Sequence, residues 1–172
     1  MGRLSSNVRR HYTTVVHFPS PLPELRRATH ADASAVTECV HAGYAHWVSV
    51  VGMKPGPMLQ NYEEVLAKEQ VFVAEAACKV VGVLVLSVTG EGFLLENVAV
   101  HPMHAGLGLG RRLLALAEQE AVAQGHASIH LYTHERMTEN VALYRKLGYQ
   151  EYARRTEHGF ARVYMRKVLN DA

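Results

Sequence analysis

The sequence predicts an α/β sandwich, in which about four helices flank a mixed sheet of about six to seven strands. Apolar runs rich in β-branched residues cover residues 71–75, 80–88 and 93–100 and are separated only by short polar breaks. This pattern is typical of antiparallel neighbours in a sheet. A helical spacing of apolar residues over 110–124 then leads to a further apolar run over 128–133. A strand, a helix and a strand in this order predict a parallel pair, so the sheet is expected to be mixed.

The segment before these strands is expected to contain one short strand and two helices. Residues 25–28 form the expected strand. Thr29 or Asp32 is suited to cap the first helix, which should extend to about Trp47. A break rich in proline and glycine follows, and apolar residues at helical spacing predict a second helix over residues 58–68.

The segment after residue 133 predicts a helix and a closing hairpin. The helix contains Tyr144. The hairpin strands should cover residues 150–155 and 162–168, with a turn at His158 and Gly159.

Length and composition indicate one domain. A chain of 172 residues is long enough to build one core, which we place in residues 23–172. Residues 1–22 are polar and then rich in proline, so we interpret them as an N-terminal extension of partly disordered character. They contain no apolar run that resembles a signal peptide.

Charge and cysteine content limit the classes of function. The 18 basic and 16 acidic residues are mixed along the chain, which argues against a nucleic-acid partner. The longest apolar runs are too short to span a bilayer, so no membrane partner is expected. The two cysteines do not form a secreted disulfide framework, and a cytoplasmic location is expected. Histidines four residues apart, such as His130 and His134, fall on a predicted strand, and no metal site is expected.

The most informative motif is a glycine loop between a strand and a helix. Gly106, Gly108 and Gly110 leave the loop nearly free of side chains. Its backbone N–H groups and the positive end of the following helix therefore suit an anionic phosphate. The spacing differs from a P-loop, which needs a lysine and a serine or threonine after the last glycine, and from the dinucleotide-binding GxGxxG pattern. The loop predicts that the protein binds a phosphorylated cofactor.

This loop resembles the acetyl-CoA signature of the GNAT-type N-acetyltransferase superfamily. Residues 100–102, Val-His-Pro, supply the turn that ends the preceding strand, and Gly108 and Gly110 supply the two small residues of the signature. Ala105 stands where the superfamily usually has arginine or glutamine. One side-chain contribution to the phosphate loop is therefore missing, although the backbone cradle needs no side chain.

A second segment resembles the same superfamily. Residues 138–149 are similar to its last helix, and Tyr144 falls on the tyrosine of that helix. Met137 replaces an asparagine that is often found seven residues before the tyrosine, and Asn140 lies three residues later. The two segments together extend the resemblance from the glycine loop to the C-terminal part of the chain.

The resemblance implies that acetyl-CoA is the co-substrate. It also implies that the strand ending at Val100 splays away from the next parallel strand, so that the pantetheine arm enters the gap. The cofactor-binding residues that it implies lie on this strand, in the loop and on the last helix: Val98, Ala99, Val100, Leu107, Gly108, Leu109, Gly110, Arg111, Arg112 and Asn140.

The resemblance further implies direct transfer of an acetyl group to a primary amine. Tyr144 would donate a proton to the sulfur as general acid, and its alternative role is to pack its helix on the sheet. Glu96 would act as general base through water, and strand alternation would place it on the same face as Val100. Alternatively, Glu96 organises a hydrogen bond or binds a substrate cation. His134 and Glu135 are the rival candidates for the base.

The acceptor is expected to be a small-molecule or peptide amine. Tyr44, Trp47, Met58 and Tyr62 form an aromatic and apolar set that would line its pocket, although such spacing is also typical of a core. The sequence does not separate a small amine, an amino acid, an antibiotic and a protein amine. A non-catalytic acyl-CoA-binding sensor or partner module is the alternative from another class. Members of the superfamily often dimerise, but no segment of this sequence identifies an interface.

Overall fold

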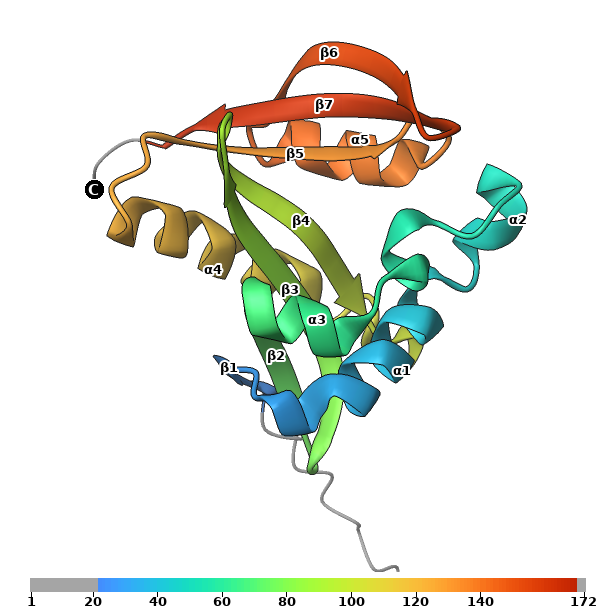
Figure 1. The fold of residues 1–172 in the computed structure, drawn as a ribbon, viewed down its shortest axis with the longest axis vertical. Helices are drawn as coiled ribbons and strands as arrows, with labels where there is room; N and C mark the ends of the chain where they lie inside the picture. Colours follow the sequence, from blue (N-terminus) through green and yellow to red (C-terminus); the bar gives the residue numbers. More distant parts are fainter. Residues whose placement is uncertain (1–21, 170–172) are drawn as a thin grey trace, which may run out of the picture.

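The computed structural model describes residues 22–169, which form one seven-stranded sheet in the order β1-β2-β3-β4-β5-β7-β6 (Figure 1). The strands are β1 (Glu24–Arg27), β2 (Gln70–Ala76), β3 (Lys79–Thr89), β4 (Gly92–Val100), β5 (Ser128–His134), β6 (Gln150–Glu157) and β7 (Phe160–Val168). Only β4 and β5 pair in parallel, and all other neighbours are antiparallel. The predicted mixed sheet is therefore confirmed. Residues 1–21 of the predicted extension lie outside the described residues.

Helices cover both faces of the sheet. They are α1 (Ala33–Tyr44), α2 (Trp47–Val51), α3 (Tyr62–Lys68), α4 (Leu109–Ala123) and α5 (Thr138–Lys146), with 3₁₀ turns η1 (His30–Asp32), η2 (Gly56–Leu59) and η3 (Pro102–His104). In Figure 1 α1 and α3 lie in front of the sheet, and α4 passes behind it. None of the helices within residues 22–169 has the length and apolar character needed to cross a bilayer.

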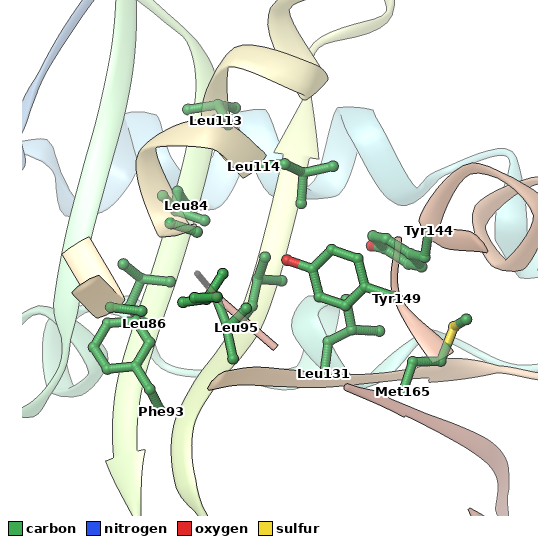
Figure 2. Close-up of a cluster of buried hydrophobic side chains, with 14 of the residues drawn as sticks. Leu84, Leu86, Phe93, Leu95, Leu113, Leu114, Leu131, Tyr144, Tyr149 and Met165 are labelled. Atoms are coloured by element: carbon green, nitrogen blue, oxygen red, sulfur yellow. The ribbon is translucent and has the colours of Figure 1, made fainter. Parts of the chain in front are cut away.

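Two separate apolar clusters hold these layers together. One packs α1 and α3 against β2 and β3 through residues such as Val40 and Val83. The other packs α4 and α5 on the opposite face, where Leu113, Leu131 and Tyr149 belong to the same cluster (Figure 2). The centre of β3 contributes side chains to both clusters, which explains why its sequence is apolar without interruption.

Two of the predicted helices are shorter in the structure than their sequence pattern indicated. The first ends at Tyr44, and a separate turn of helix begins at Trp47, whose side chain packs with Val51 and Met137. The second begins at Tyr62. Asn61, the residue before it, has an extended backbone, and its side chain accepts a hydrogen bond from the N–H of Glu63, which caps the helix. In both places, contacts outside the apolar repeat decide where the helix starts or ends.

A β-bulge in β4 changes which face each residue occupies. Leu95 pairs with Leu86 and Asn97 pairs with Val85, so Glu96 is the extra residue. After the bulge, Asn97 turns toward α1 and α3, whereas Val100 packs on the α4 side. The expectation that strand alternation places Glu96 and Val100 on one face is therefore wrong, since the bulge interrupts the alternation.

Gly82 allows α4 to lie close to β3. A Cβ atom built on Gly82 would be 3.1 Å from Ala74 Cβ, 3.1 Å from Leu113 Cδ1 and 3.2 Å from Leu109 Cδ2. Gly82→Val should therefore lower the free energy of unfolding by about 1–3 kcal/mol through overpacking. Gly90→Val is the control, because a Cβ atom placed on Gly90 would have no other atom within 4 Å. Urea unfolding measures both variants, and equal stabilities would contradict this account of the helix–sheet contact.

Candidate active site

A cavity opens where β4 and β5 separate. The two strands pair at only three positions, the last of which joins Leu95 to Leu131. Both strands continue beyond this pair, β4 to Val100 and β5 to His134. The cavity has a volume of about 240 Å³ and is lined from β4, β5, β7, α5 and the segment around η2. The splay that the family resemblance implied is thus present in the structure.

Glu96 lines this cavity beside a glutamine. Its Oε1 atom accepts a hydrogen bond of 2.9 Å from Gln60 Nε2. The Oε1 atom of Gln60 is buried and has no hydrogen-bond partner among the described residues. The bulge and the extended backbone before α3 bring these two side chains together. This corner therefore contains a carboxylate at the cavity and, behind it, a buried amide oxygen without a hydrogen-bond donor among the described residues.

Asn97, the residue after Glu96, ties β4 to α1 and α3. Its Oδ1 atom accepts from Tyr44 Oη at 2.8 Å, and its Nδ2 atom donates to Tyr62 Oη at 3.0 Å. Tyr62 in turn donates to the carbonyl of Pro57 at 2.8 Å. Burial raises the pKa of Tyr44 and of Tyr62 above the usual range, so both hydroxyls stay protonated. The network fixes the wall of the cavity that contains Tyr44.

Tyr144 reaches the cavity from α5. It is 6% exposed, and burial raises the pKa of its hydroxyl to about 12. No other described side chain or carbonyl accepts a hydrogen bond from it. Its ring contacts Tyr149, with ring centroids 5.8 Å apart, and both rings lie in the cluster shown in Figure 2. Tyr144 is thus both a packing residue and a protonated donor at the cavity.

β5 and β7 supply the opposite wall. The guanidinium of Arg162 lies 4.2 Å above the ring of Tyr132, and its Nη1 atom donates to Glu157 at 2.8 Å. His134 also lines the cavity, and its Nδ1 atom accepts the backbone N–H of Arg136 at 3.1 Å. Burial lowers the pKa of His134, which favours its neutral form.

The rival bases and the predicted acceptor residues separate into two groups. His134 and Tyr44 line the cavity. Glu135 does not: its carboxylate is half exposed, 3.9 Å from Arg154. Three predicted acceptor residues also lie outside the lining, namely Trp47, Met58 and Tyr62, of which Trp47 and Tyr62 are buried in apolar clusters. For these two, the alternative interpretation as core residues agrees with their surroundings.

The predicted cofactor-binding residues lie at one end of β4 and beyond it. Gly106 and Gly108 have φ values of +76° and +80°, and no atom lies within 4 Å of a Cβ built on either. Gly108 is the N-cap of α4, so Leu109, Gly110 and Arg111 fall in its first turn, where N–H groups have no intrahelical acceptor. The loop is therefore an open backbone cradle that fits an anionic phosphate.

Other members of the predicted cofactor set have different surroundings. The backbone N–H of Arg112 donates to Gly108 within the helix at 3.1 Å, and its side chain donates to the carbonyl of Pro23 at 3.0 Å. The backbone N–H of Arg112 is therefore already paired, unlike a free donor of the predicted phosphate loop. Val98 and Asn140 line the cavity, whereas Ala99 is buried against α1.

The sequence did not single out several residues that line the cavity. They include Gln60, Asn97, Tyr132, Phe160 and Arg162. Phe160 and Arg162 lie on β7, in the hairpin that the sequence predicted, but the predicted strand gave them no role at the site. For Gln60 and Asn97 no local pattern gave a signal, since their positions depend on the bulge and on chain segments that are distant in sequence.

The structure is an α/β protein with a cavity at the split between β4 and β5 and an open glycine loop at the N-terminus of α4. These features suit the binding of a phosphorylated ligand beside the free edge of a strand. Residues 67–151, from α3 into β6, match the family described as acetyltransferase (GNAT) domain. These residues are therefore a GNAT acetyltransferase domain. Comparison with curated proteins gave no match.

Solved structures share the fold. A GCN5-related N-acetyltransferase from Rhodopseudomonas palustris has a TM-score of 0.73 and 20% identity, over 89% of this chain and 99% of that chain. The PaiA N-acetyltransferase from Thermoplasma acidophilum, solved in complex with coenzyme A, has a TM-score of 0.70 and 17% identity, over 84% and 98%. YncA from Salmonella typhimurium, solved with its cofactor acetyl-CoA, has a TM-score of 0.66 and 22% identity, over 89% and 96%.

Proposed function

We propose that the protein transfers an acetyl group from acetyl-CoA to a primary amine by direct attack on the thioester. The observation that supports this proposal is the cavity between the separated strands, because both Glu96 and Tyr144 line it. The family supports acetyl transfer as the reaction type. The unpaired amide oxygen of Gln60 beside Glu96 supports an amine as the acceptor.

The residues present fit acetyl-CoA. The open cradle from Leu107 to Arg111 would hold the pyrophosphate through backbone N–H groups and the positive end of α4. The edge of β4 beyond Leu95 includes Val98 and Val100, and no strand within residues 22–169 pairs with it on the β5 side. This edge would pair with the extended pantetheine arm. PaiA and YncA, which share the fold, were solved with coenzyme A and acetyl-CoA respectively.

The two candidate catalytic residues match the two proton transfers of the reaction. When bound, acetyl-CoA supplies an acyl carbon that is activated by its thioester bond. The acceptor nitrogen forms the new C–N bond as the C–S bond breaks. Glu96 would remove the proton that the amine must lose, directly or through water. Tyr144 would give its proton to the departing sulfur, since its raised pKa keeps the hydroxyl protonated at neutral pH.

Gly108→Glu should abolish acetyl-CoA binding, because the new side chain places bulk and negative charge in the phosphate cradle. Gly125→Glu is a matched control: its φ of +78° resembles the +80° of Gly108, and it also lies at an end of α4, but outside the cradle. Calorimetric titration measures the affinity of both variants for acetyl-CoA, with NADH and ATP as control ligands. Similar melting temperatures show that both variants are folded. Equal affinity in both variants would overturn the loop assignment.

Tyr144→Phe should lower kcat by about 100-fold while acetyl-CoA binding changes little, because the variant keeps the ring and loses only the proton donor. Tyr149→Phe is the control, since the neighbouring Tyr149 hydroxyl is buried and lies outside the cavity lining. Release of free thiol on a panel of amines measures both rates. Equal rates for wild type and Tyr144→Phe across pH would assign Tyr144 a packing role only.

Glu96→Gln should lower kcat/KM by about 100-fold near neutral pH, because the acceptor amine is then mostly protonated and needs a base. The loss should shrink as the pH approaches the pKa of the amine, where the acceptor arrives neutral. A loss that is independent of pH would instead indicate that Glu96 positions the substrate. His134→Gln is measured in parallel, and a larger loss in that variant would move the base to His134.

Acetyl-CoA binding without turnover of any amine would favour the non-catalytic alternative.

A further inference from the structure

The cavity contains two opposite charges that do not neutralise each other. Glu96 is its one acidic lining residue and Arg162 its one lysine or arginine, within the part of the chain that the structure describes. Glu96 is bonded to Gln60, and Arg162 is paired with Glu157 instead. The lining also contains His134, and burial lowers its pKa, which favours its neutral form. The remaining lining residues carry no charge at neutral pH.

The Glu96 side of the cavity suits an amine. The carboxylate of Glu96 and the buried Oε1 atom of Gln60 both accept hydrogen bonds. No donor among the described residues reaches the amide oxygen, and a buried unpaired acceptor costs free energy until a donor reaches it. An ammonium or amine group carries the donors that this corner lacks.

The Arg162 side suits a carboxylate. A guanidinium has five N–H donors in a fixed plane, and the hydrogen bonds among residues 22–169 use one of its nitrogens, Nη1, to bond Glu157. The ring of Tyr132 lies under this plane at 4.2 Å and restricts its orientation. Glu157 also accepts a hydrogen bond of 2.6 Å from the hydroxyl of Tyr164. The guanidinium is therefore held in place while donors remain for a second carboxylate.

We propose that the acceptor is a free amino acid, whose amine lies at Glu96 and Gln60 and whose carboxylate is bound by Arg162. This inference rests on the proposed function and names the acceptor class. A polyamine or aminoglycoside would need several carboxylates, and the cavity lining offers one. The N-terminal amine of a protein carries no carboxylate beside it, so it would leave Arg162 without its ligand.

The test compares matched acceptors with the full-length protein and saturating acetyl-CoA. The panel contains the twenty protein amino acids, their amides, and three decarboxylated amines: phenethylamine, isoamylamine and histamine. The best amino acids should exceed their amides and decarboxylated amines in kcat/KM by about tenfold or more, as expected for a hydrogen-bonded charge pair. Arg162→Gln should remove this preference, because it should lower kcat/KM for the amino acids much more than kcat/KM for their amides. Arg162→Lys should retain part of the preference, because it keeps the charge but loses the planar fork.

Arg155→Gln is the matched control. Arg155 also lies over a tyrosine ring of the same sheet, 5.1 Å from Tyr164, but it does not line the cavity. This variant should keep the full preference. Melting temperature and acetyl-CoA affinity show whether each variant is folded. If Arg162→Gln does not fold, Arg162→Lys together with the wild-type panel decides the question.

The outcomes separate the two proposals. Equal acetylation of amino acids, amides and decarboxylated amines would overturn the acceptor class and leave acetyl transfer to amines standing. A preference for amino acids that survives in both Arg162 variants would overturn the role of this residue. Absence of turnover with every member of the panel, despite acetyl-CoA binding, would overturn the acceptor class, and absence with a wider amine panel would overturn the proposed function as well.

Discussion

The departure of β4 from β5 is the constraint on which the candidate site depends. The strands pair in parallel at three positions and then separate, although both continue. The bulge at Glu96 coincides with this point, and a bulge bends and twists the strand that contains it. The separation leaves an open strand edge beside a cavity, and it gives Tyr144 of α5 access to that cavity. In Figure 1 β5, β7 and β6 cross the top of the molecule, whereas β4 runs downward.

The split in the sheet brings polar side chains to a partly buried cavity, and several of them bond to one another or to their neighbours. Asn97 bonds both Tyr44 and Tyr62, and Arg162 is held by Tyr132 and Glu157. Such networks rigidify a site because breaking any member leaves a buried polar group unpaired. The same burial keeps the tyrosine hydroxyls protonated, since it disfavours their charged form. Within residues 22–169, the Oε1 atom of Gln60 is left without a hydrogen-bond donor.

Much of the fold could be predicted because its signals are local. The β-branched runs, the apolar repeat of α4 and the turn at Gly159 each lie within a few consecutive residues. The glycine loop is equally local, and its open backbone follows from the positive φ values that glycine accepts without strain. Helix ends were less accurate, because Trp47 packs on a distant residue and an asparagine cap starts α3 later than the apolar spacing indicated.

The sequence by itself determined the order of the elements, the mixed sheet, the open glycine loop and the resemblance to GNAT acetyltransferases. It also identified Tyr144 and Glu96, which the structure places at one cavity. Only the tertiary structure decided the face of each residue after the bulge, the packing roles of Trp47 and Tyr62, and the entry of Gln60 and Arg162 into the cavity. The physical reason is sequence distance. Gln60 and Glu96 are 36 residues apart, and strand register and helix packing bring them together. No periodicity within one segment encodes such a contact, because the free energy that fixes it comes from burying several segments at once.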